Sequence, residues 1–170
     1  SGTTPMTIAA FAQIRALSTK NDIPAEACSP FDKNRDGFVM AEGSTVLIME
    51  SEESANSRNA KIYGYVDGYG ATTDAHHITA PAEGGAGALR AMELALKDAG
   101  IEKNKIEYIN AHGTSTPAND KNETLAIKEL FAEHAYDLQI SSSKSMTGHL
   151  LGGAGAFESM VCLLSLKNNK

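Results

Sequence analysis

The chain has 170 residues, 42% of them hydrophobic, which suffices for one domain with a sizeable core. Its 21 acidic residues outnumber its 15 basic ones, the formal net charge is −6, and no cluster of lysines and arginines marks a nucleic-acid surface. The longest apolar run, near MVCLLSL, is far shorter than the roughly 20 residues that span a bilayer, and the N-terminus lacks the charged-then-apolar order of an export signal. We therefore expect a cytoplasmic protein that binds neither nucleic acid nor membrane and keeps Cys28 and Cys162 reduced.

The first 70 residues are expected to form a helix, a long loop and two short strands. Thr4 is a suitable N-cap and Pro5 a suitable first helical residue, and apolar side chains then recur at helical spacing. Residues 19–38 are rich in Pro, Asn, Asp and Gly, which is typical of a loop. The apolar run TVLIME (residues 45–50) and the alternating KIYGYVDGYG (residues 61–70) have the length and pattern of strands.

From residue 84 onward, predicted helices and strands alternate. They are a helix at 84–100, a strand at 106–110, a helix at 119–135, a strand at 137–143 and a helix at 151–168. Gly100 is expected to end the first of these helices, and Asn119 or Asp120 to cap the second. The alternation predicts an α/β fold with parallel strands, in which ligands bind at the carboxyl ends of the strands.

Two histidines follow the predicted strands in similar surroundings. His112 lies in NAHGTSTPAND, after the strand at 106–110, and His149 lies in SSSKSMTGHLLGGAG, together with Lys144, after the strand at 137–143. We expect all three side chains at one edge of the sheet. Neutral imidazole N–H groups that converge on one oxygen stabilise negative charge there, so this edge is a candidate active site.

One segment resembles a calcium-binding loop only in part. DKNRDG, residues 32–37, imitates the start of a calcium-binding loop, but the twelfth position is Gly43, and Glu42 lies one residue early. A strand-like segment follows instead of a helix. The pattern favours a turn, and we expect no metal site.

Three segments in order, PFDKNRDGFVMAEG, NAHGTSTPANDKNET and SSSKSMTGHLLGGAGA, resemble the decarboxylating β-ketoacyl-[acyl-carrier-protein] synthases, in particular the elongating synthases of the type II system. The resemblance covers essentially the whole chain. It implies a thiolase-like layered αβαβα fold, of which residues 1–75 would be the tail of the N-terminal half and residues 76–170 most of the C-terminal half. It also implies a homodimer, acyl-carrier protein as partner, and no cofactor beyond the phosphopantetheine that the substrate carries.

The resemblance further implies a decarboxylative Claisen condensation at a Cys-His-His site. His112 and His149 would hold the malonyl thioester oxygen as enolate charge develops. Lys144 would add positive charge beside them, and Glu158 would pair with Lys144.

The same resemblance assigns residues to the substrate channels. Thr114 and Thr116 would bind the pantetheine amide, and Phe11 and Thr79 would line the acyl and pantetheine channels. The ordinary alternatives are that the Thr114 hydroxyl satisfies its own loop and that Phe11 is core.

The nucleophilic cysteine of such an enzyme is expected upstream of Ser1, and a Phe-containing gating loop beyond the C-terminus. Cys162 is expected to be a small buried core residue, and Cys28 an unactivated loop residue that is far from either histidine in sequence. The chain alone is therefore expected to be inactive and to expose an apolar face. A serine hydrolase with His112 as base remains an alternative, although no GxSxG elbow is present; a non-catalytic, chain-length-factor-like or truncated interaction chain is another.

Overall fold

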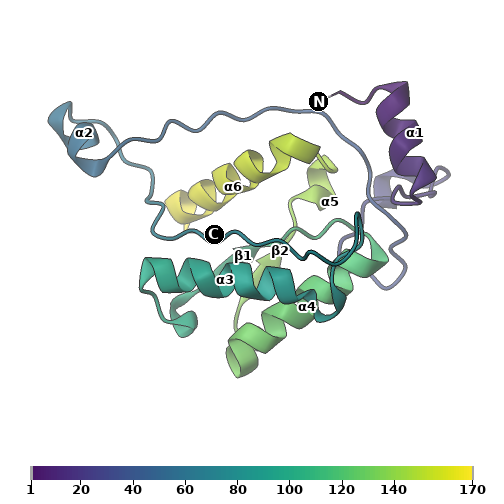
Figure 1. Cartoon of the computed structure of the whole chain (residues 1–170). Helices are drawn as coiled ribbons and strands as arrows, with labels where there is room; N and C mark the ends of the chain where they lie inside the picture. The colour runs from purple at the N-terminus through teal and green to yellow at the C-terminus, as the bar shows by residue number, and fades with distance from the viewer. Residues whose placement is uncertain (1, 170) are drawn as a thin grey trace.

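Helices lie on both sides of a short parallel pair of strands in the computed structural model, which describes residues 2–169 (Figure 1). The α-helices are α1 Pro5–Gln13, α2 Glu52–Ser57, α3 Ala86–Ala99, α4 Pro117–Phe131, α5 Lys144–Thr147 and α6 Ala154–Asn168, and the strands are β1 Tyr108–Asn110 and β2 Gln139–Ser141. Short 3₁₀ turns are η1 Pro24–Glu26, η2 Glu83–Gly85, η3 Lys103–Lys105, η4 Ala132–Tyr136 and η5 Leu151–Gly153. β1 and β2 pair in parallel, with Ile109 opposite Ile140, which confirms the predicted α/β arrangement.

The strand pair separates α3 and α4 from α6 (Figure 1). On the α3–α4 side, Ile127 and Phe131 of α4 form a buried cluster with Leu138. Met92 of α3 and Ile109 of β1 pack against this cluster. The buried side chains of α4 thus pack α4 against β1 and the residue that precedes β2.

The helix ends follow capping chemistry, with one correction. Thr4 caps α1 and Gly100 ends α3 with a φ angle of 65°, both as predicted. The prediction that Asn119 or Asp120 caps α4 is wrong, because the helix begins earlier. The Thr116 side chain accepts from the Asn119 N–H, and Pro117 takes the first helical position, where a missing N–H costs nothing.

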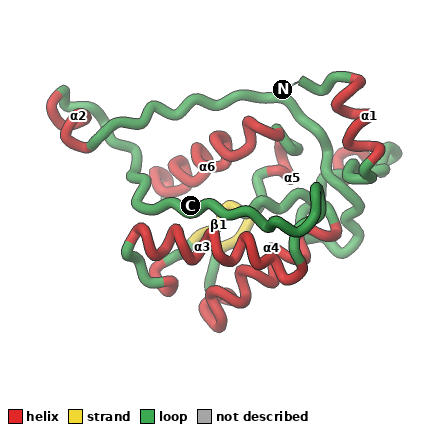
Figure 2. Tube along the Cα trace, in the orientation of Figure 1, coloured by secondary structure: helices red, strands yellow, loops and turns green. Residues whose placement is uncertain are grey.

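The two strands predicted at 45–50 and 61–70 are not formed, although both segments are extended; Figure 2 shows them as loop. A strand needs a hydrogen-bonded neighbour, and within residues 2–169 neither segment has one. Val46 and Ile48 are consequently 81% and 84% exposed.

Segment 61–70 is held by helices instead of by a sheet. Gly64 lies against the Leu163 side chain of α6, and Gly68 and Gly70 lie against the backbone of α3, so closely that a Cβ atom would collide. Tyr69 N–H donates to Asp98 of α3. None of the helices within residues 2–169 is long and apolar enough to cross a membrane.

Candidate active site

The three residues expected at one sheet edge do meet there. His112 follows β1, Lys144 opens α5 after β2, and His149 follows α5. The two imidazole rings stand nearly perpendicular, at 86°, with centroids 5.3 Å apart. His149 is fixed by its backbone, because its N–H donates to Val39 O at 2.7 Å and its carbonyl accepts from Ala41 N–H at 3.0 Å.

Lys144 is the charged centre of the site and is only 1% exposed. Its Nζ donates to the His112 carbonyl at 2.7 Å and lies 3.3 Å from His112 Nδ1. The expected ion pair with Glu158 of α6 is present. A buried ammonium needs such partners, because an unpaired charge in the interior is strongly disfavoured.

Both imidazoles are neutral with a defined tautomer. His149 Nδ1 accepts from the Leu151 N–H at 3.0 Å, and His112 Nδ1 faces Lys144 Nζ, which can only donate. Burial, then the Lys144 charge and then His112 lower the pKa of His149 to about 4. Burial and Lys144 also lower the pKa of His112. The proton of each neutral ring therefore sits on Nε2, so the two rings, with centroids 5.3 Å apart, each keep one N–H donor.

The loop that carries His112 is clamped by two residues that sequence reasoning missed. Glu123 accepts from His112 N–H at 2.7 Å and from Gly113 N–H at 2.8 Å. Ser142 Oγ donates to the Gly113 carbonyl at 2.8 Å. A carboxylate in the second turn of a helix that opens straight after a His-Gly loop is the signal that could have revealed Glu123.

The predicted threonines lie together in the loop after His112. Thr114 is buried, and its Oγ1 is 2.9 Å from Thr116 Oγ1. Thr116 Oγ1 also accepts from Asn119 N–H at 3.3 Å as the cap of α4. Both hydroxyls therefore have structural partners within this loop and the start of α4.

Phe11 and Thr79 are placed differently relative to the histidines. Phe11 packs edge-on against Phe38 at 5.3 Å, and Phe38 packs edge-on against His149 at 5.1 Å, so Phe11 lies one ring away. Thr79 lies in an exposed loop, where its N–H donates to His77 Nδ1 at 3.1 Å. No hydrogen bond within residues 2–169 joins Thr79 to the histidine pair.

The structure places one cysteine beside the site and contradicts the expected burial of the other. Cys28 is close to the site, since its Sγ donates to the Lys144 carbonyl at 3.0 Å. Cys162 is half-buried, not a fully buried core residue. Burial raises the pKa of both thiols, so neither is an activated nucleophile.

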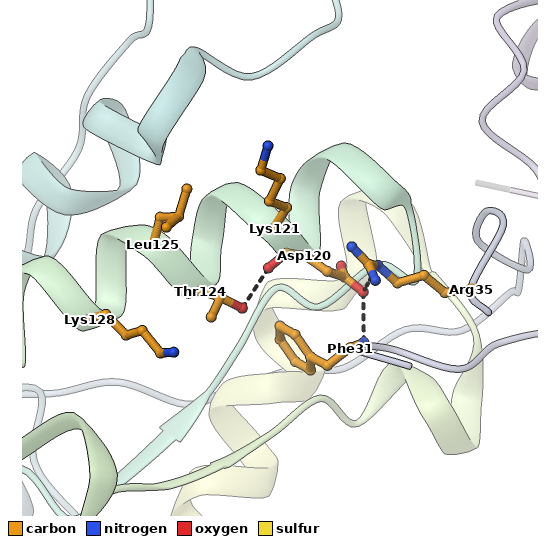
Figure 3. Close-up of a pocket in the computed structure, with 7 residues that line it drawn as sticks. All are labelled: Phe31, Arg35, Asp120, Lys121, Thr124, Leu125 and Lys128. Atoms are coloured by element: carbon orange, nitrogen blue, oxygen red, sulfur yellow. Dashed lines mark hydrogen bonds and ion pairs between the residues drawn. The ribbon is translucent and has the colours of Figure 1, made fainter. Parts of the chain in front are cut away.

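A hollow of about 250 Å³ lies beside α4, and neither histidine lines it (Figure 3). It is lined by Phe31, Arg35, Asp120, Lys121, Thr124, Leu125 and Lys128. Asp120 is 1% exposed, accepts from Phe31 N–H at 2.8 Å and pairs with Arg35 at 3.3 Å. This cluster fastens the loop of residues 29–37 to α4. Within residues 2–169, no group of three or more His, Cys, Asp and Glu side chains is placed to hold a metal ion.

Comparison with known proteins gives matches to two family models. "Beta-ketoacyl synthase, N-terminal domain" matches residues 2–55, and "Beta-ketoacyl synthase, C-terminal domain" matches residues 63–170. The chain is 56% identical over 98% of its length to proteins named 3-oxoacyl-[acyl-carrier-protein] synthase 2 from Synechocystis and from Staphylococcus aureus. It spans 40% of the first of these relatives and 41% of the second.

The fold agrees with that of solved ketosynthases. A chain of AntDE:AntF, described as a type II PKS acyl-carrier protein in complex with its ketosynthase bound to the hexaketide, superposes with a TM-score of 0.92 at 42% identity. The superposition covers 97% of the present chain and 41% of that chain. The structure is therefore part of a thiolase-like fold, as the sequence predicts.

Proposed function

The chain belongs to the β-ketoacyl synthase family, and on that premise we propose that it supplies the decarboxylating side of the active site of a 3-oxoacyl-[acyl-carrier-protein] synthase II. Such a transferase would extend an acyl chain by two carbons in fatty-acid synthesis. The single observation that carries the proposal is the pair of neutral imidazoles, His112 and His149, with both Nδ1 atoms already occupied.

The proposed reaction uses the two Nε2–H donors. The malonyl thioester oxygen would accept from both rings. The bond between the malonyl α-carbon and its carboxylate would then break. CO2 would leave, and the electron pair of that bond would move into the thioester, giving an enolate. Each donor aimed at the enolate oxygen is worth about 3 kcal/mol in comparable oxyanion sites. The enolate carbon would next attack an acyl thioester on the enzyme and expel the cysteine thiolate.

Lys144 would act through the rings. Its positive charge opposes protonation of His112 and His149, which keeps both rings neutral while they donate. Its hydrogen bond to the His112 carbonyl holds that ring in place. Glu158 balances the buried charge, so the site tolerates an ammonium group in its interior.

The raised thiol pKa values support a nucleophile other than Cys28 and Cys162. Acyl-carrier protein is the proposed partner, in line with the carrier protein in the AntDE:AntF complex. Its phosphopantetheine would make a separate cofactor unnecessary, with Thr114 and Thr116 on the pantetheine amide. Phe11 and Thr79 remain proposed channel residues, and a cytoplasmic homodimer is the proposed assembly.

A chimera tests the proposal. Residues 2–169 would replace the aligned segment of the Staphylococcus aureus relative, which supplies the remaining part of a synthase. Incubation with acyl- and malonyl-carrier protein should give a 3-oxoacyl product, measured by mass spectrometry. A chimera that is folded by circular dichroism and takes up the acyl group, yet forms no product, would refute the synthase and favour the non-catalytic interaction chain.

A further inference from the structure

Ser115, between the two threonines, has a backbone conformation that its side chain disfavours. Its φ angle is 69°, in the left-handed region. Glycine adopts this region freely, whereas a residue with a Cβ atom does so at a cost in free energy. Ser115 is also completely buried, at 0% exposure. A serine in this position therefore needs a compensating interaction in the interior.

The compensation is a bond to a second segment. Ser115 Oγ accepts from the Ser29 N–H at 3.0 Å, and the Ser115 carbonyl accepts from the Gly37 N–H at 3.0 Å. Both ends of the loop of residues 29–37 are thereby fastened to one residue. No other acceptor for the Ser29 N–H lies within residues 2–169, so removing the Ser115 hydroxyl leaves a partly buried donor unpaired.

We infer that Ser115 is a positioning residue: its bond to Ser29 holds the turn in which the hydroxyls of Thr114 and Thr116 meet, two residues after His112. These hydroxyls lie 2.9 Å apart, and the Ser115 hydroxyl, between them in sequence, accepts from the Ser29 N–H. The inference rests on the proposed function, in which both hydroxyls bind the pantetheine arm of malonyl-carrier protein. A turn that is free to change would weaken that binding and misplace the thioester relative to the histidines.

Loss of this one bond does not detach the loop. Asp120 accepts from Phe31 N–H at 2.8 Å, and Arg35 Nη2 donates to the Pro117 carbonyl at 2.9 Å. Figure 3 shows Asp120 joined to Phe31 and Arg35. Variants of Ser115 are therefore expected to fold.

Three variants of the chimera test the inference. Ser115→Ala keeps the Cβ atom in the left-handed conformation and loses the bond, whereas Ser115→Gly loses the bond but relaxes the backbone. Ser29→Ala is the matched control, because the Ser29 hydroxyl has no hydrogen-bond partner among residues 2–169 and its N–H remains. Ser115→Ala should raise KM for malonyl-carrier protein about tenfold with a smaller change in kcat. Ser115→Gly should raise this KM less, and Ser29→Ala should have the same KM as the parent chimera.

A purely structural role would lower the fraction of active enzyme, and so kcat, without this change in KM. A parental KM in Ser115→Ala, or an equal effect of Ser29→Ala, would overturn the inference.

Hydrogen exchange separates this inference from the proposed function. In Ser115→Ala, the Ser29 amide should exchange about tenfold faster, since its acceptor is gone. A parent chimera that is folded and acylated but forms no product would refute the proposed function alone, and the exchange rate would still decide whether Ser115 holds Ser29. Unchanged exchange at Ser29 would contradict the inference.

Discussion

The buried pair of Lys144 and Glu158 allows stability and catalysis to be separated. Lys144→Met in the chimera removes the cation and leaves the Glu158 carboxylate, 17% exposed, without its ammonium partner. Breaking a buried pair from one side costs about 3–5 kcal/mol of unfolding free energy. Adding Glu158→Gln removes the stranded charge, so the double variant should recover most of that loss, to within about 1–2 kcal/mol of the parent.

Catalysis should not recover in the same way. The double variant still lacks the Nζ that donates to the His112 carbonyl and keeps both imidazoles neutral. Urea unfolding followed by circular dichroism gives the stability of each variant, and CO2 release from malonyl-carrier protein gives the activity. A double variant as unstable as Lys144→Met, or one with parental decarboxylation, would refute this account of Lys144.

Three further outcomes are expected. The pKa of His149 is about 4 in the folded chain, against 6.5 in the unfolded chain. Between these pH values the unfolded chain binds a proton that the folded chain does not bind, so the free energy of unfolding should fall as the pH drops from 6.5 to about 4. His149→Asn should flatten that part of the stability-versus-pH curve, and an unchanged slope would contradict the pKa assignment. Ala132→Gly should stabilise the protein by about 1 kcal/mol, because Ala132 has a φ angle of 51°. The control Ala88→Gly, inside α3, should destabilise by a similar amount, about 1 kcal/mol, and thermal unfolding compares the two. Neither Cys28 nor Cys162 of the 170-residue chain should be acylated by acyl-carrier protein, since both thiol pKa values are raised; a stoichiometric mass shift of the intact chain would refute this.

That His112, Lys144 and His149 lie together could be predicted from the sequence, because their placement follows from local signals. His112 and Lys144 each come directly after a strand, and parallel strands end at the same edge. The cap of α4 was misassigned because Thr116, Asn119 and Asp120 are all good caps. Pro117, which favours the first helical position, was the signal that distinguishes them.

The remaining differences depend on contacts distant in sequence. Segments 45–50 and 61–70 have the residue pattern of strands. A strand also needs a neighbouring strand with which to form hydrogen bonds, and neither segment has one within residues 2–169. Cys28 and Lys144 are 116 positions apart in the sequence, and the spacing of apolar residues does not predict that they are in contact. The role of Ser115 depends on a φ angle and a partner in another loop, and neither is encoded in the adjoining residues.

The most direct test of the two-imidazole site is CO2 release from malonyl-carrier protein by the chimera carrying His149→Ala. Removing one of two donors to an oxyanion should slow release about 100- to 1000-fold. Acylation of the enzyme, measured by intact mass in the same preparation, should persist, because the acyl group is carried elsewhere. Decarboxylation at the parental rate with the His149 N–H absent would contradict the assignment of the His112–His149 pair as the oxyanion donors.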